Sequence, residues 1–294
     1  MNSNTNTNVQ WSEKISISNR LADYVQHKGS QKKASVSLNV SNATISQILS
    51  SKWESISDEM WRKVSSGVGG GANEWVMVTD VSVTNKLLQF LKESQQLSLV
   101  FGITADAGSG KSATIQHYVQ NNENAYAISC NEYMEEKDFV LEIFKAMGRE
   151  PNSTRIYPMT VELMDLLKRT SYPVLILDEA DKLRNRVLNF FITFYNQLEG
   201  VCGINLIATS YLSKRIRNGA MNNTKGFREI YSRLGRKFIE LNEVTYTDVY
   251  KICHANGVTD DKIIQEIFDD SDHDLRRVKR RVIAENRKKQ MRNG

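Results

Sequence analysis

The feature that most constrains the fold is a glycine-rich segment, residues 105–112, placed between an apolar run and a helical pattern. It reads Ala-Asp-Ala-Gly-Ser-Gly-Lys-Ser, and the apolar run before it covers residues 97–103. A strand, a tight loop of small residues and a helix in this order are typical of a P-loop, whose backbone N–H groups surround phosphates. The usual first glycine is Ala105 here, which is the smallest replacement. We therefore expect an α/β fold with a phosphate-binding loop at the end of a parallel strand.

Residue types within this loop predict a bound nucleoside triphosphate with its metal. Lys111 is expected to reach the β- and γ-phosphates, and the Ser112 hydroxyl is expected to bind Mg²⁺. The remaining candidates bind the phosphates through the loop and the first turn of the helix: Ala107, Gly108, Ser109, Gly110 and Ala113. The predicted cofactors are ATP and Mg²⁺.

A second motif lies at residues 173–179, where a short apolar run ends in two carboxylates. The run is too short for a typical helix and too apolar for a half-exposed strand, so it predicts a strand buried on both faces of a parallel sheet. Functional groups in such sheets lie at the carboxyl ends of strands. Asp178 is placed to hold the Mg²⁺ shell, and Glu179 to orient and deprotonate a water molecule. The two motifs together indicate an ATPase.

The bulk composition is that of a globular protein with about two domains. The formal charge of +5 permits nucleic-acid binding, and residues 276–292 contain nine Lys or Arg and one acid, Glu285. This run is either a phosphate-binding footprint or a solvated face; loops near Tyr133 or Arg184 are equal candidates for contacting DNA.

Nothing in the chain has the length of a membrane span, and residues 1–8 lack a signal-peptide core. The cysteines match no zinc spacing and are expected to be buried free thiols, which suits the cytoplasm: Cys130, Cys202 and Cys253.

Periodicity divides the chain into five segments. We expect a tail at 1–10, a helix-turn-helix domain at 11–66, a linker at 67–74, an α/β core at 75–243 and a helical lid at 244–294. Within the core, strands are expected at 125–129, 174–177, 204–208 and 237–241, and helices at 83–91, 138–147, 161–170 and 187–198. Strands that alternate with helices predict a parallel sheet in a three-layer arrangement.

The segment 30–50 has the pattern of a helix-turn-helix. Asn39 is expected at the turn, where the backbone is left-handed, and Ser41 at the N-cap of the second helix. The inner faces are expected to hold Ala34, Val36, Leu38, Val40, Ile45, Ile48 and Leu49. Candidate DNA contacts are Asn42, Thr44, Ser46 and Gln47 for base edges or phosphates and Lys32, Lys33 and Lys52 for phosphates. A small helical docking domain with a polar face is the alternative.

These parts, taken in order, resemble the AAA+ transposition ATPases of the phage Mu B type. The resemblance runs from about residue 30 to residue 281, and it rests on the helix-turn-helix, the P-loop, the Leu-Asp-Glu-Ala-Asp strand end and the basic helical end. It implies an AAA+ core with a helical lid, assembly of a homo-oligomeric helical filament on double-stranded DNA, and activation of a partner transposase. Origin-recognition and helicase-loader ATPases share the same parts.

The resemblance also implies roles for four further positions. Thr209 matches the residue that senses the γ-phosphate, with Ser210 as the alternative. Arg233 matches an arginine finger supplied to a neighbouring subunit, with Arg228 second. Arg276 matches an arginine of the lid that contacts the nucleotide. The family's usual glycine three residues before that arginine is His273 here, which is expected to be a surface histidine.

Two other functions remain open at this stage. One is a replication-initiation or helicase-loader ATPase, which nothing in the chain excludes. The other is a helix-turn-helix regulator that only senses a nucleotide. Glu179 argues against the regulator, because a pure sensor needs no carboxylate to activate water.

Overall fold

The computed structural model describes residues 11–68 and 75–293, so the expected tail and most of the expected linker lie outside the described residues. The chain divides into two compact units. One contains the first four helices together with residues 144–150, and the other contains residues 76–143 and 151–294.

The first unit is built from four helices around an apolar core. They are α1 (Trp11–Lys28), α2 (Gln31–Leu38), α3 (Asn42–Leu49) and α4 (Asp58–Val68). Fully buried side chains from α1, α3 and α4 meet in the core: Ile17, Leu21, Ile45, Ile48, Trp61 and Val64. Helix α4 includes Gly67 and Val68, the first two residues of the segment expected to be a linker, because Val68 is buried against this core.

The second unit is organised around a five-stranded sheet whose strands all run parallel. The strands are β1 (Val100–Thr104), β2 (Ala125–Ser129), β3 (Val174–Asp178), β4 (Gly203–Ala208) and β5 (Ile239–Glu240), in the order β2-β3-β4-β1-β5. Every residue of β3 and β4 is buried, which explains why these strands are mostly apolar; Asn205 of β4 is a buried exception. The predicted α/β fold with a parallel sheet is confirmed.

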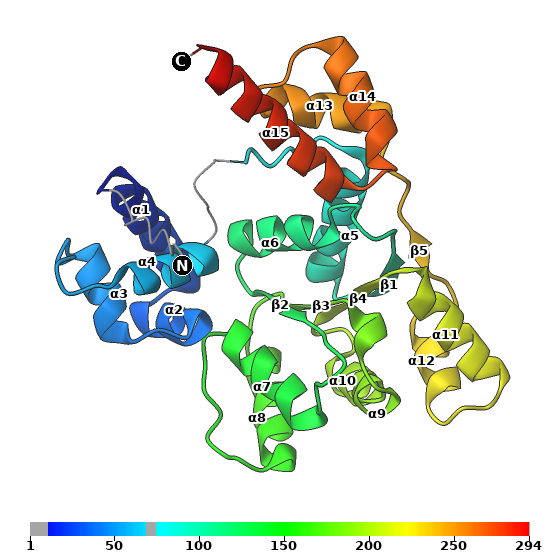
Figure 1. The fold of residues 1–294 in the computed structure, drawn as a ribbon. Coiled ribbons are helices and arrows are strands. Elements are labelled where there is room, and N and C mark those ends of the chain that lie inside the picture. Colours follow the sequence, from blue (N-terminus) through cyan, green and yellow to red (C-terminus); the bar gives the residue numbers. More distant parts are fainter. Residues whose placement is uncertain (1–10, 69–74, 294) are drawn as a thin grey trace, which may run out of the picture. The chain divides into compact units, whose positions relative to one another are not determined.

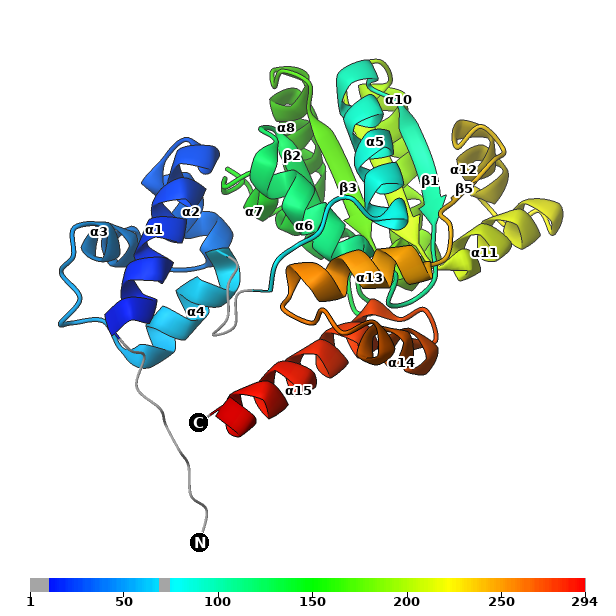
Figure 2. The same ribbon diagram turned by 90° about the horizontal axis from the view of Figure 1, so that it is seen from above.

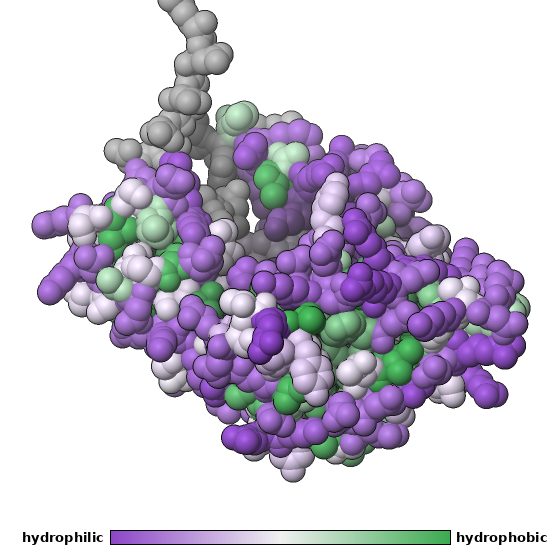
Figure 3. Space-filling view, turned by 90° about the horizontal axis from the view of Figure 1, so that it is seen from below, coloured by the Kyte–Doolittle hydropathy of each residue, from purple (hydrophilic) through white to green (hydrophobic). Residues whose placement is uncertain are grey.

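Helices cover both faces of this sheet. On one face lie α5 (Ser82–Leu97) and α6 (Lys111–Asn121), and on the other lie α7 (Glu136–Ala146), α8 (Ile156–Lys168) and α10 (Phe190–Leu198), as Figures 1 and 2 show. The short helices η1 (Ala180–Lys182) and α9 (Asn185–Leu188) follow β3. Seen from the α7 to α10 side, the surface is mostly hydrophilic with small apolar patches (Figure 3). The three layers agree with the predicted architecture.

Three predicted element boundaries were wrong. Residues 97–99 do not belong to a strand, because α5 continues to Leu97 and ends at Ser98, whose backbone is left-handed. The helix expected at 187–198 is divided at Asn189 into α9 and α10; buried side chains lie on both sides of the break, so hydrophobic periodicity does not reveal it. The last strand, expected at 237–241, is only two residues long, and Gly235 and Arg236 shortly before it have positive φ values.

The remaining helices form a pair at the β5 edge and a three-helix lid. The pair is α11 (Ser210–Met221) and α12 (Phe227–Arg233), and the lid is α13 (Tyr246–Ala255), α14 (Asp261–Ser271) and α15 (Leu275–Asn293). Figure 2 shows α13, α14 and α15 packed beside one another. Their contacts bury Val249, Ile264, Ile267, Val278 and Val282. In the described part of the chain, no helix combines the length and the apolar character needed to cross a bilayer.

Polar contacts join the lid helix α13 to the segment that enters α5. Asp248 accepts hydrogen bonds from the backbone N–H of Ser82 (2.8 Å) and from its hydroxyl (2.5 Å). Lys251 forms an ion pair with Asp80 at 2.9 Å. The Asn256 side chain accepts from the Val76 N–H and donates to the Val76 carbonyl. The lid is thus held to the entry of the core by side chains of α13 and of its C-cap residue, Asn256.

Candidate nucleotide site

The glycine-rich loop connects the end of β1 to the start of α6, as the sequence predicts. Its tight course depends on two glycines, since Gly108 has φ of 80° and Gly110 has φ of 91°. Both values lie in the left-handed region, which costs a residue with a side chain free energy. Helix α6 begins at Lys111, so its unpaired N–H groups and the positive end of its dipole lie at the loop. This geometry suits an anion.

The ammonium group of Lys111 lies folded against this loop. It donates to the carbonyl oxygens of Ala105 (2.8 Å) and Asp106 (2.6 Å), and only 9% of the residue is exposed. Burial lowers the pKa of Lys111, and the nearby carboxylates of Asp178 and Asp106 offset part of that decrease. A buried cation held by neutral carbonyls is stabilised when an anion arrives. The loop therefore fits a phosphate-bearing ligand.

Ser112 and Asp178 meet across the site. The Ser112 hydroxyl donates to a carboxylate oxygen of Asp178 at 2.6 Å, and the other oxygen of Asp178 accepts from the Glu179 N–H at 3.0 Å. Burial raises the pKa of Asp178 despite these two hydrogen bonds. A hydroxyl and one carboxylate are the oxygen donors that a protein usually offers to Mg²⁺ beside phosphate oxygens. The pair expected to hold the metal is thus in place to do so.

Glu179 follows directly after β3, with a left-handed backbone (φ 56°) that directs the chain into η1. Its side chain forms an ion pair with Lys182 at 2.6 Å and remains partly exposed. Glu179 and Asp178 are neighbours at the carboxyl end of one strand, at the same edge of the sheet as the P-loop. A partly exposed carboxylate at this edge can accept a proton from water.

The structure adds residues to the site that the sequence reasoning missed. Thr209 donates its hydroxyl proton to Asp181 at 2.9 Å, so the expected γ-phosphate sensor is joined to the turn after β3. Arg215 of α11 donates to the Asp181 carbonyl and to the Asn185 side chain. Asp181 is the third acid of the Asp-Glu-Ala-Asp segment, so the sequence did contain a pattern that could have placed Asp181 at the site. No sequence signal pointed to Arg215 or Lys182, because their partners come from the folded turn.

The lid reaches the P-loop through the start of α15. The Leu275 N–H donates to the Gly108 carbonyl at 2.9 Å, and the Asp274 carboxylate lies where a side chain at Gly108 would have to fit. Arg276 is near enough to Lys111 to contribute to the lowering of its pKa. Two of the residues named for the nucleotide, Lys111 and Arg276, therefore come together from the core and the lid.

His273 adopts the backbone conformation that explains the glycine usual at its position. Its φ is 60°, and Asp272 before it has φ of 50°. Its Nδ1–H donates to the Val244 carbonyl at 2.7 Å, and its ring lies edge-on to Phe268. These contacts compensate for backbone strain. The side chain is exposed, as expected, yet it has a structural role at the entry to α15.

The two candidate arginine fingers do not contact the P-loop of their own chain in the described structure. Arg233 donates to the Asn196 side chain at 2.8 and 3.1 Å, pairs with Glu229 and lies over the Tyr195 ring. Arg228 donates to the Ala220 carbonyl. Both positions agree with a finger that serves another subunit, and they do not test that role.

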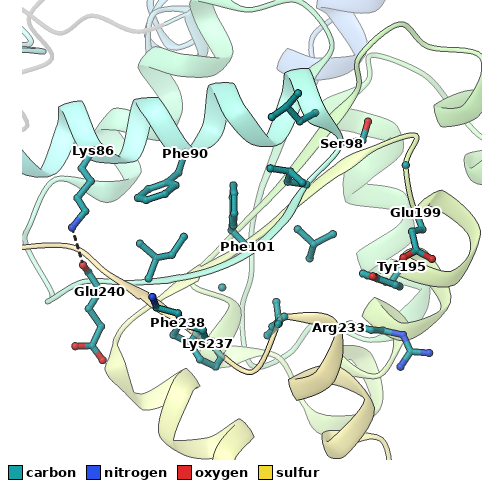
Figure 4. Close-up of a pocket in the computed structure, with 18 residues that line it drawn as sticks. Lys86, Phe90, Ser98, Phe101, Tyr195, Glu199, Arg233, Lys237, Phe238 and Glu240 are labelled. Atoms are coloured by element: carbon teal, nitrogen blue, oxygen red, sulfur yellow. Dashed lines mark hydrogen bonds between the residues drawn. The ribbon is translucent and has the colours of Figure 1, made fainter.

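Arg233 borders a pocket of about 870 Å³ along the β1 and β5 edge of the sheet. Figure 4 shows Lys86 and Glu240 joined at one end of this pocket and Tyr195, Glu199 and Arg233 gathered at the other. None of the P-loop residues lines it. The pocket is therefore separate from the candidate nucleotide site.

In the first unit, the expected turn and cap between α2 and α3 are present. Asn39 has φ of 52°, and the Ser41 side chain accepts from the Thr44 N–H. Of the residues expected inside, Ala34, Leu38, Ile45 and Ile48 are buried and Val36, Val40 and Leu49 are partly buried. Of the residues expected to contact DNA, Asn42, Ser46, Lys32 and Lys52 are exposed and Thr44, Gln47 and Lys33 are partly exposed. DNA binding by this face stays a prediction.

The three cysteines, Cys130, Cys202 and Cys253, are buried and unpaired, as expected. Burial raises the pKa of each thiol, which keeps it neutral and unreactive.

Comparison with known families identifies the core. A family model described as an AAA domain matches residues 93–216, which include the P-loop, Asp178, Glu179 and Thr209. This match supports a P-loop ATPase of the AAA type for that part of the chain. No curated protein matches the chain. The match covers less than half of the 294 residues, and it extends to neither the lid nor the first unit.

Proposed function

We propose that the protein is an ATP-dependent DNA-binding AAA+ ATPase that assembles on double-stranded target DNA and directs a transposase. The observation that carries the ATPase part is the joint placement of Lys111, Ser112, Asp178 and Glu179 at one edge of the sheet. The AAA-domain match supports the same reading. The transposition role rests on the resemblance of the domain order to the AAA+ transposition ATPases.

In this proposal the chain's own residues divide the work of hydrolysis. Bound Mg·ATP would supply the phosphoanhydride bond that is broken. Lys111 and the α6 N-terminus would neutralise phosphate charge, and Ser112 and Asp178 would hold Mg²⁺. Glu179 accepts the proton of the attacking water once Lys182 releases its carboxylate. Thr209 senses the γ-phosphate through the same turn, and Arg276 closes the lid on the nucleotide.

The first unit would provide DNA contacts, and Arg233 would complete the site of a neighbouring copy. The α2–α3 segment presents Asn, Thr and Gln side chains, which can hydrogen-bond base edges and phosphates. A site shared between copies makes assembly depend on bound nucleotide, because each copy then binds its neighbour more tightly with ATP present. ATP is expected to promote a filament on DNA, and hydrolysis is expected to dissolve it.

Two substitutions test the ATPase assignment. Lys111→Ala should abolish binding of a fluorescent ATP analogue. Glu179→Gln should still bind it but lower the hydrolysis rate by about a hundredfold or more, the usual contribution of a general base. Lys262→Ala and Glu266→Gln are matched controls, because both side chains are exposed on α14 away from the site. Wild-type hydrolysis by Glu179→Gln would show that Glu179 is not the base.

Electron microscopy tests the assembly on DNA. Glu179→Gln with ATP and random-sequence duplex should form long-lived filaments that coat the DNA, and wild-type filaments should disappear as ATP is consumed. Duplex that stays bare with saturating protein and ATP would contradict the proposal and favour a helicase loader instead.

A further inference from the structure

The cations of α15 fall into two groups that differ in their partners. Arg277 and Arg281 both lie at 3.7 Å from the Asp270 carboxylate of α14, and Lys288 pairs with Glu285. Within the part of the chain that the structure describes, neither Arg280 nor Arg287 has an ion-pair partner, and both are exposed. Some arginines of this exposed helix have partners within the chain and others do not. The guanidinium groups without a partner can bind an anion from outside the chain.

Three exposed arginines lie along one face of the helix. At about 100° per residue, Arg276, Arg280 and Arg287 fall within an arc of about 40°. Arg277 and Arg281 lie on an adjacent face toward α14, and Glu285 lies on the opposite side from the three arginines. Arg287 lies eleven positions after Arg276, so the stripe is about 16 Å long. Its first member, Arg276, lies near Lys111 of the nucleotide site.

The chemistry of this stripe suits a row of phosphates. Duplex DNA presents one negative charge per about 1.7 Å of its axis, and guanidinium groups bind phosphate in a bidentate manner. Ile283 and Ala284 are the residues between the arginines on this face, and neither side chain offers a hydrogen-bond donor or acceptor to a base edge. Contacts of the arginines with phosphates would be independent of sequence.

We propose that Arg280 and Arg287, which continue the α15 stripe beyond Arg276 at the nucleotide site, bind the phosphodiester backbone of duplex DNA. This inference rests on the proposed function and names a DNA-contacting surface in the lid, in addition to the α2–α3 face of the first unit. Because the stripe begins beside the nucleotide site, nucleotide-dependent positioning of the lid also positions the stripe on DNA. Target DNA is held there without sequence preference.

The test compares two pairs of arginines on the same helix. Arg280→Ala/Arg287→Ala removes the unpaired cations, and Arg277→Ala/Arg281→Ala removes an equal charge from the face paired with Asp270. Binding of fluorescein-labelled random duplex is measured by anisotropy with Mg·ATP between 50 and 200 mM salt. Removing two phosphate contacts should reduce the slope of log K against log salt by about 1.8 and weaken binding about tenfold or more. The Arg277/Arg281 variant should keep the wild-type slope, and Arg280→Lys/Arg287→Lys should restore most of it.

The outcomes separate this inference from the proposed function. An unchanged slope for Arg280→Ala/Arg287→Ala, or an equal decrease in both alanine pairs, would overturn the stripe while leaving DNA binding by the wild type intact. A wild type that binds no duplex would overturn the proposed function and the stripe with it. Binding of the ATP analogue should be unchanged in all three variants, which shows that the lid remains folded.

Discussion

At the scale of single residues, the site holds two groups whose charged forms are destabilised by burial. Burial lowers the pKa of Lys111 and raises the pKa of Asp178, so each shift is toward the neutral form. A protein that keeps such groups without bound ligand gives up some stability to do so. Mg²⁺ and phosphate oxygens are the partners that would make both charges favourable.

Asp178→Asn tests this cost. Because the folded-state pKa of Asp178 is raised, its ionised form destabilises the fold at neutral pH, and that cost disappears as the pH falls below the ordinary Asp value of about 3.9. The variant should therefore melt at a higher temperature than the wild type at pH 7 and at an equal temperature near pH 3. It should also lose the Mg²⁺-dependent part of the stabilisation by ATP. A lower melting temperature at pH 7 would show that the Asp178 hydrogen bonds outweigh its burial.

At the scale of elements, the lid depends on how α13 begins. Thr245 and Asp248 form a capping box in which each side chain accepts from the other's backbone N–H, and Asp248 also holds Ser82. Burial alone would raise the pKa of Asp248, but the hydrogen bonds from Ser82 and Thr245 outweigh it, so the pKa is lowered. One carboxylate therefore both starts a helix and attaches the lid to the core.

Asp248→Asn should destabilise the protein by about 1–3 kcal/mol at pH 7, since an amide oxygen cannot replace both charge-assisted acceptors. With a lowered folded-state pKa, the Asp248 contribution is fully present above the ordinary Asp value and is lost as the pH falls through the folded value. The difference between variant and wild type in denaturant unfolding should thus shrink between pH 5 and pH 2. Lys251→Ala, which removes an exposed ion pair with Asp80 and a hydrogen bond to its carbonyl, should have little effect. If the difference in unfolding free energy between Asp248→Asn and wild type stays constant with pH, the Asp248 charge does not provide this stability.

At the scale of the whole molecule, the proposed function depends on a nucleotide site shared between copies. Arg233 is held by Asn196 and Tyr195 on α10, and it has no described contact with the P-loop of its own chain. In the proposed function, an arginine held in this way serves a nucleotide bound to another copy. Activity of the protein would then depend on assembly.

Mixing two inactive variants tests directly whether two copies share one nucleotide site. Arg233→Ala should lower the hydrolysis rate by about a hundredfold or more, since an arginine finger contributes at least that much. Lys111→Ala lacks its own nucleotide but retains Arg233. Equal amounts of the two variants should regain hydrolysis with DNA present, because Lys111→Ala supplies the arginine that its neighbour lacks. A mixture as inactive as its components would place Arg233 outside the site, and the same mixture with Arg228→Ala in place of Arg233→Ala tests the second candidate.

The sequence by itself determined the local chemistry. The P-loop, the Asp178–Glu179 strand end and the alternation of strands and helices could be recognised because small residues, buried apolar runs and carboxylates must follow one another within a few positions. The α2–α3 turn was predictable for the same reason, since Asn39 and Ser41 act on their immediate neighbours.

The tertiary structure alone decided which distant residues meet. The order β2-β3-β4-β1-β5, the contact of Leu275 with Gly108, and the attachment of Thr209 and Arg215 to the turn after β3 join segments far apart in the chain. The division of the α15 arginines into paired and unpaired groups likewise depends on where Asp270 lies. Local sequence patterns do not predict such pairings, because packing energy depends on which surfaces the whole chain brings together.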